Sequence, residues 1–274
     1  MEATTARLAT FPPRFVGLQI ELPRLLSVFD KLLVCVNEAD GPPSFLKGDE
    51  RITAASSKED LKGAGKFFFP IMPNELVYLI DDDIHYPGNY ATVMKHHLQR
   101  AGPRAIVGVH GVYCRATSSG AERTRANHFA FAAPLYGAPP VIGAGTLCTY
   151  GMNLPPLDEM MAEGGVGVDA LLARYCANQG IALVSVPRRR NWLSSNGNTI
   201  ASVWETYSQY NPPGQANAMR DALDLRNGAV HRALLWRLNA ARVFSPTFIP
   251  YTMEKIGLRI RETVHRLLMR MLCR

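Results

Sequence analysis

The sequence lacks the cysteine arrangements that indicate a disulfide framework or a zinc site. Its five cysteines are scattered along the chain and include no C-x-x-C pair. Secreted disulfide scaffolds carry even numbers of cysteines at characteristic spacings, so this set argues against one. We therefore expect a cytoplasmic protein.

Long hydrophobic segments are also missing. No uninterrupted apolar run is long enough to cross a bilayer, and the first residues, MEATTARLATFPPR, contain no apolar stretch typical of a signal peptide. The 274 residues are 47% hydrophobic and 19% charged, the composition of an ordinary globular protein. This length is sufficient for one large α/β domain with a full core.

Positive charge is concentrated at the end of the chain. Residues 231–274 contain nine Lys/Arg and two Asp/Glu, whereas residues 1–230 contain 21 of each and are neutral. We therefore expect a folded domain over residues 1–230 and a basic helical extension over residues 231–274. Residues 252–274 predict an amphipathic helix that either lies on an anionic membrane or packs its apolar stripe on the domain. No nucleic-acid-binding motif is present, so nucleic acid is not an expected partner.

Short apolar segments alternate with helical patterns in the first half of the chain, which is typical of a mostly parallel sheet covered on both faces. The predicted strands are residues 7–11, 31–37, 51–54, 76–80 and 105–109, and the predicted helices are 16–29 and 90–101. Further along, the pattern predicts an exposed loop at 118–125, a helix at 166–179, a strand at 181–186 and a mobile active-site loop over 188–216.

Three consecutive carboxylates follow the strongest predicted strand. Asp81, Asp82 and Asp83 come directly after LVYLI (residues 76–80). Ligands of open α/β sheets bind beyond the carboxyl ends of strands, and in an extended segment Asp81 and Asp83 point to the same side. Two such carboxylates suit Mg²⁺ or Mn²⁺, whose coordination shell phosphates and water complete. The alternative is a solvated acidic turn without a ligand.

This segment, ELVYLIDDDIHYPGNY, resembles the D-x-D segment of GT-A-fold glycosyltransferases, in particular the family 2-like enzymes of bacterial surface-polysaccharide synthesis. Other stretches are similar to that family in the same order, and the likeness spans roughly residues 7–210: LATFPPR, KLLVCVNEADGPPSFL, Gly65-Lys66-Phe67, VIGAGT and GVGVDALLARYCANQGIALVSVPRRRNWL. The resemblance implies a GT-A fold, a Rossmann-like and mostly parallel sheet flanked by helices. It also implies metal-dependent transfer of a sugar from a nucleoside-diphosphate sugar to a hydroxyl of a glycan or lipid-linked acceptor, in surface glycan synthesis.

The resemblance further implies roles for individual residues. Asp81 and Asp83 would hold Mn²⁺ or Mg²⁺, and Asp82, together with Asp81, would contact the nucleotide-sugar. The other residues expected around the nucleotide and its diphosphate are Thr10, Arg14, Asn37, Lys66 and Arg190. His110 ends a predicted strand at the same sheet edge, where it could reach the metal or the sugar, or serve only as a structural histidine.

Asp169 is the candidate general base that deprotonates the acceptor hydroxyl in an inverting displacement. Glu163 is the alternative base, and a purely local role for Asp169 as a helix N-cap is also open. The chain has no Gln-x-x-Arg-Trp motif, which argues against a processive synthase, and a lone Asp169 stands where the family has a Glu-Asp pair.

Two other functions stay open at this point. A nucleotidyltransferase of sugar phosphates also uses carboxylates to hold Mg²⁺, although ATFPPRFVG is a poor match to a phosphate-binding loop. A non-catalytic, membrane-associated binding protein could keep the fold without activity.

Overall fold

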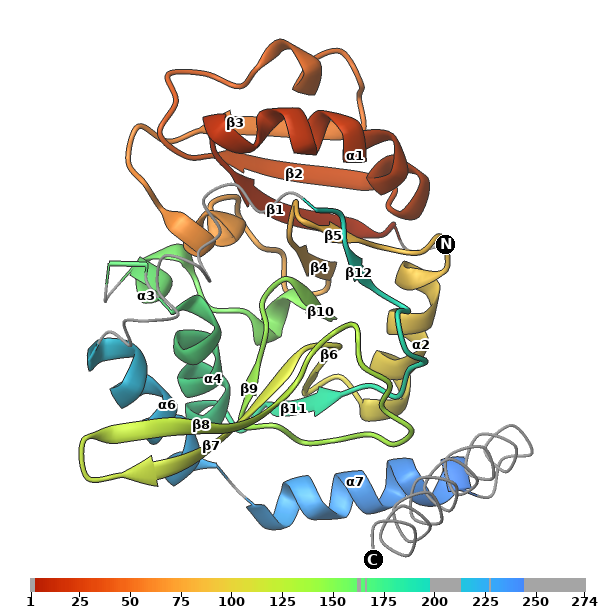
Figure 1. Cartoon of the computed structure of the whole chain (residues 1–274), viewed down its shortest axis with the longest axis vertical. Helices are drawn as coiled ribbons and strands as arrows, with labels where there is room; N and C mark the ends of the chain where they lie inside the picture. The colour runs from red at the N-terminus through yellow and green to blue at the C-terminus, as the bar shows by residue number, and fades with distance from the viewer. Residues whose placement is uncertain (1–2, 162–163, 166, 198–212, 227, 244–274) are drawn as a thin grey trace, which may run out of the picture.

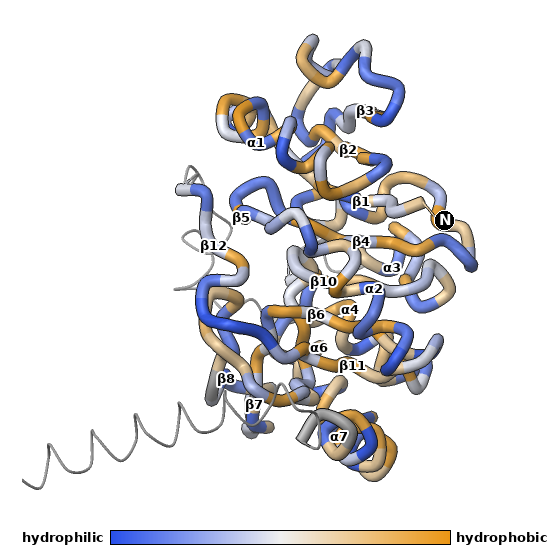
Figure 2. The backbone as a smooth tube through the Cα atoms, turned by 90° about the vertical axis from the view of Figure 1, so that its right-hand side faces the viewer, coloured by the Kyte–Doolittle hydropathy of each residue, from blue (hydrophilic) through white to orange (hydrophobic). Residues whose placement is uncertain are grey.

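The computed structural model describes residues 3–161, 164–165, 167–197, 213–226 and 228–243. Its central element is a seven-stranded sheet in the order β11-β6-β10-β4-β1-β2-β3, which Figure 2 shows from the side. Six strands run in one direction and β10 is antiparallel to its neighbours β4 and β6. The strands are β1 (Thr5–Thr10), β2 (Lys31–Val36), β3 (Ile52–Ser56), β4 (Leu76–Ile80), β6 (Ala105–Gly108), β10 (Thr146–Tyr150) and β11 (Ala182–Ser185). The predicted α/β class with a mostly parallel sheet is thus confirmed.

Helices cover both faces of this sheet (Figure 1). One core contains side chains of α1 (Phe15–Val28), α2 (Tyr90–Ala101) and α7 (Gly228–Val243). The other contains side chains of α3 (Leu157–Met161), α4 (Val168–Asn178) and α6 (Pro213–Leu225). Strand β4 contributes Tyr78 and Ile80 to the first core and Val77 and Leu79 to the second. Its continuous apolar sequence follows from this burial on both sides.

The order of the strands reverses between β1 and β4. From β1, the chain places β2 and β3 on one side and β4 on the other. In doubly wound sheets, ligands bind at the carboxyl edge beside such a reversal. Because Thr10 ends β1 and Asp81 follows β4, both residues lie at this position.

Smaller elements complete the fold. A three-stranded antiparallel sheet contains β7 (Gly111–Thr117), β8 (Gly120–Asn127) and β9 (Val141–Ile142), and β5 (Ile84–His85) pairs with β12 (Ser194–Ser195). The short 3₁₀ helices are η1 (Pro12–Arg14), η2 (Ser44–Leu46), η3 (Lys62–Phe67) and η4 (Gly151–Asn153). The prediction of a loop at residues 118–125 is wrong, because most of them lie in the β7–β8 hairpin. Strand β8 reads GAERTRAN, and its backbone pairing needs no apolar pattern.

The C-terminal part begins as an integral piece of the domain. Helix α7 crosses the predicted domain boundary between residues 230 and 231, and its Leu238 is buried in the first core. Asn239 accepts a hydrogen bond from the Tyr136 backbone N–H at 2.9 Å and donates one to the Tyr136 carbonyl at 3.1 Å. The predicted amphipathic helix over 252–274 lies outside the described residues. Within the described part of the chain, no helix combines the length and apolarity needed to cross a membrane.

Candidate functional site

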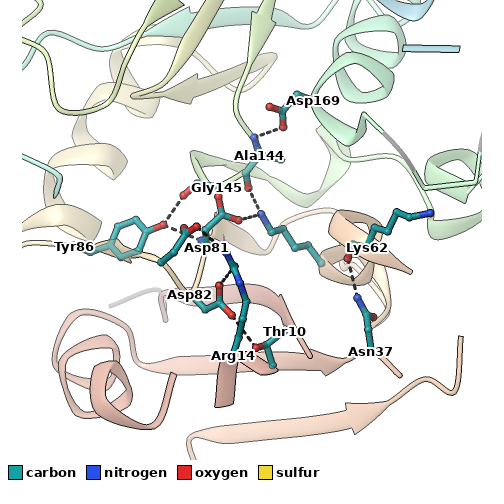
Figure 3. Close-up of polar contacts among 12 residues, drawn as sticks. Thr10, Arg14, Asn37, Lys62, Asp81, Asp82, Tyr86, Ala144, Gly145 and Asp169 are labelled. Carbon is teal, nitrogen blue, oxygen red and sulfur yellow. Dashed lines mark hydrogen bonds and ion pairs between the residues drawn. The ribbon is translucent and has the colours of Figure 1, made fainter. Parts of the chain in front are cut away.

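Asp82 is the buried member of the acidic triplet, with 1% of its surface exposed. Its Oδ2 accepts a hydrogen bond from Thr10 Oγ1 at 2.8 Å, and its Oδ1 pairs with the guanidinium of Arg14. Burial raises the pKa of Asp82 to about 6, although Arg14 and Thr10 act in the opposite direction. Figure 3 shows the three side chains in one cluster. Asp82 therefore links the ends of β1 and β4 across the reversal of strand order.

Asp81 and Asp83 are more accessible, with side chains 37% and 29% exposed. Asp81 pairs with the ammonium of Lys66, and Asp83 Oδ2 accepts a hydrogen bond from Arg14 Nη2 at 3.0 Å. Burial, and then the charge of Asp81, raise the pKa of Asp83. The extended geometry expected for the triplet is wrong, because Asp82 and Asp83 form a turn before β5. Asp81 and Asp83 still interact electrostatically.

The carboxylates of Asp81 and Asp83 suit a hard divalent cation whose remaining coordination positions are filled by substrate. Mg²⁺ is usually bound by one or two carboxylates together with substrate phosphates and water. Two partly exposed carboxylates whose charges repel are suited to that role, because a cation between them removes the repulsion. Among the described residues, no three His, Cys, Asp or Glu side chains converge on a site that could hold a metal ion by themselves. Phosphate oxygens would therefore have to complete the shell.

A loop of three residues, Gly143, Ala144 and Gly145 (the glycine loop), closes the site on its other side. Lys66 Nζ donates to the Ala144 carbonyl at 3.1 Å while it also pairs with Asp81. Tyr86 Oη donates to the Gly145 carbonyl at 2.5 Å and accepts the backbone N–H of Asp81 at 2.9 Å. The Ala144 carbonyl is thus connected to Asp81 through Lys66, and the Gly145 carbonyl is connected to Asp81 through Tyr86.

The close packing of Gly145 against the Asp81 carboxylate predicts the effect of Gly145→Ala. An ideal Cβ at Gly145 would lie 1.6 Å from Asp81 Oδ2, so the carboxylate or the loop must move. We expect a destabilisation of about 1–3 kcal/mol, the usual cost of overpacking, and a loss of metal-dependent nucleotide binding. Thermal denaturation and calorimetry measure both. Gly88→Ala is the matched control, because nothing lies within 4 Å of a Cβ there. Unchanged melting and binding in Gly145→Ala would contradict the close packing of Gly145 against Asp81.

Asp169 approaches the glycine loop from α4. Its Oδ1 accepts the backbone N–H of Ala144 at 2.8 Å, as Figure 3 shows. The carbonyl of the same residue accepts a hydrogen bond from Lys66, so Ala144 connects the two side chains. Burial is the main cause that raises the pKa of Asp169, opposed by the Ala144 N–H and by Lys66. A raised pKa brings a carboxylate closer to the range that suits a general base.

The local alternative for Asp169 is wrong. The N-cap of α4 is Gly167, whose left-handed φ of 73° a residue with a side chain adopts only with strain. Asp169 lies in the first turn of the helix and bonds to a different segment of the chain. Glu163, the alternative base, lies outside the described residues.

The remaining predicted site residues have different surroundings. Asn37 is buried and donates to the Lys62 carbonyl at 3.0 Å, so it supports η3, the helix that carries Lys66. Burial, and next the neighbouring His128, lower the pKa of His110 to about 4, so its imidazole is neutral at pH 7. Arg190 is exposed in a turn beyond β11, and the described ion pairs of the acidic triplet involve Arg14 and Lys66 instead.

Comparison with known proteins adds no assignment. No protein-family model matches the chain, and no curated protein matches it significantly.

Two residues that support the site were not predicted from the sequence. Tyr86 connects Asp81 to Gly145, and Asn196 donates its Nδ2 to the Asp82 carbonyl at 2.8 Å and its backbone N–H to the Asp83 carbonyl at 2.9 Å. Asn196 thereby fixes the acidic turn from the segment that follows β12. Tyr86 lies within the DDDIHY stretch, but nothing in the spacing indicates either contact.

Proposed function

We propose that the chain is a GT-A-type glycosyltransferase. It transfers a sugar from a nucleoside-diphosphate sugar to a hydroxyl acceptor, with Mg²⁺ or Mn²⁺ as cofactor. The observation that carries this proposal is the pairing of the Asp81–Asp83 turn with Arg14 and Lys66 at the reversal of strand order. That position is where doubly wound sheets bind nucleotides.

The charge of this cluster explains why the donor should need a metal. Three carboxylates and the two basic side chains, Arg14 and Lys66, give a net charge of −1 in their ordinary ionisation states. The cluster alone therefore repels a diphosphate. A divalent cation held by Asp81 and Asp83 would reverse the sign and supply Lewis-acid stabilisation of the leaving diphosphate. Arg14 and Lys66 are then placed to offset the remaining phosphate charge.

Asp169 is the proposed general base. Asp169 accepts the backbone N–H of Ala144, and Lys66 donates to the carbonyl of the same residue. We therefore place the donor on the Lys66 side of the glycine loop and the acceptor on the Asp169 side. Its carboxylate takes the proton of the acceptor hydroxyl as that oxygen attacks the anomeric carbon, and a single displacement of this kind inverts the configuration. The acceptor class we propose is a glycan or a lipid-linked sugar.

The test is calorimetry of nucleoside diphosphates with and without metal. We expect UDP, GDP or CDP to bind in Mn²⁺ and to lose at least about tenfold in affinity with a chelator, a change of about 1.4 kcal/mol. Asp83→Asn should show the weaker binding even in Mn²⁺. Asp40→Asn, which removes a carboxylate that is almost fully exposed, is the control and should bind as the wild type does.

Two outcomes would count against the proposal. Equal binding in Mn²⁺ and in chelator would remove the role of the carboxylate pair. Formation of a sugar nucleotide and pyrophosphate from a nucleoside triphosphate and a sugar phosphate would favour the nucleotidyltransferase instead.

A further inference from the structure

Helix α7 presents an exposed apolar face. The exposed fractions of Trp236 and Val230 are 76% and 53%, and Ala233 between them is also exposed. Residues three or four apart lie on the same side of a helix, so these three form one strip. Trp236 is the most exposed large hydrophobic residue in the described part of the chain. An exposed apolar surface of this kind often marks a site of contact with a protein or a membrane.

The opposite face of α7 holds the helix on the domain. Leu238 is buried, and Leu234 and Leu235 pack against the first core. Arg237, which borders the strip four residues after Ala233, donates to the carbonyls of Arg100 and Ala101 at the end of α2, each at 3.3 Å. Figures 1 and 2 both place α7 at the end of the molecule beyond β11. The contacts of α7 with the domain therefore hold the exposed strip in a fixed position.

The charge of the surrounding residues indicates which partner binds the exposed strip. Helix α7 contains three arginines and no acidic residue, and Arg232 is exposed beside the strip. The sequence that follows, residues 244–274, adds six Lys/Arg against two Asp/Glu. Tryptophan is enriched at membrane–water interfaces, where its ring is partly buried and its N–H stays hydrated. Basic residues near the surface of an anionic bilayer strengthen the binding further.

We propose that the Trp236 face of α7 is a docking surface for an anionic lipid bilayer. Trp236 and Val230 enter the interfacial layer, and Arg232 contacts lipid phosphates. This surface is separate from the acidic turn, so the proposal stands independently of the glycosyltransferase assignment.

Co-sedimentation of the full chain with vesicles tests it. We expect binding to vesicles of mixed phosphatidylglycerol and phosphatidylcholine, weaker binding as salt rises, and little binding to phosphatidylcholine alone. Trp236→Ser should weaken the binding on the order of tenfold, and Arg232→Ala about fivefold. Both side chains are exposed, so both variants should fold. Ile20→Ser, which alters a 69% exposed apolar residue on α1, is the matched control and should bind normally.

Each other outcome overturns the proposal. If Trp236→Ser and Arg232→Ala bind anionic vesicles as tightly as the wild type, any membrane contact is made elsewhere, for example by residues 252–274. If Ile20→Ser is weakened as much as Trp236→Ser, the effect is not specific to α7. If the chain binds nucleic acid and ignores the vesicles, its basic segment serves a different partner.

Discussion

Asp169→Asn is expected to lower turnover by about 10²–10⁴-fold while nucleotide binding in Mn²⁺ stays intact. The substitution keeps the shape of the side chain and its carbonyl oxygen, which can still accept the Ala144 N–H. It removes the negative charge and the basicity that a general base requires. Steady-state rates together with calorimetry measure the two effects separately.

Asp169→Ala distinguishes chemistry from positioning. Alanine removes the base and also the hydrogen bond to Ala144, so the glycine loop loses one of its anchors. If Asp169 is the base, both variants lose turnover, and only the alanine variant should also weaken nucleotide binding through Lys66 and Asp81. Near-normal turnover in Asp169→Asn with a large loss in Asp169→Ala would show that Asp169 positions the loop and that the base lies elsewhere.

Local patterns predict most of the central sheet. The run LVYLI predicts β4 because a strand buried on both faces has no polar alternation, and the same reasoning applies to β2 and β6. The hairpin strand β8 could not be predicted in this way. Its sequence GAERTRAN is polar, and it is a strand because β7 supplies backbone partners along its length.

The candidate site is predictable in its position and not in its detailed contacts. Three carboxylates after a buried strand point to the sheet edge, and the structure places Thr10, Arg14 and Lys66 beside them. The sequence does not show which carboxylate is buried, because that depends on the turn at Asp82 and on its contacts with Thr10 and Arg14, which lie far away in the sequence. The bond from Ala144 to Asp169 is likewise a product of tertiary packing.

Arg14→Met should be the most destabilising substitution in this site. Arg14 is buried against Asp82, and removal of one partner of a buried ion pair typically costs about 3–5 kcal/mol because the other charge is left uncompensated. Chemical denaturation measures the loss. Arg51→Met is the control: Arg51 pairs with Asp49 at the surface, where water screens both charges, so little change is expected.

A second substitution and the pH dependence of stability test whether the stability lost in Arg14→Met comes from Asp82. Asp82→Asn in the Arg14→Met background removes the stranded charge, so the double variant should be more stable than Arg14→Met alone. The folded-state pKa of Asp82, about 6, is already above its unfolded value, so the protonated form favours folding at low pH and this contribution is lost as the pH rises through 6. Without Arg14 the pKa rises further, and Arg14→Met should therefore lose more stability at pH 8 than at pH 5. A destabilisation that is independent of pH and is not relieved by Asp82→Asn would mean that Arg14 acts through packing and not through its charge.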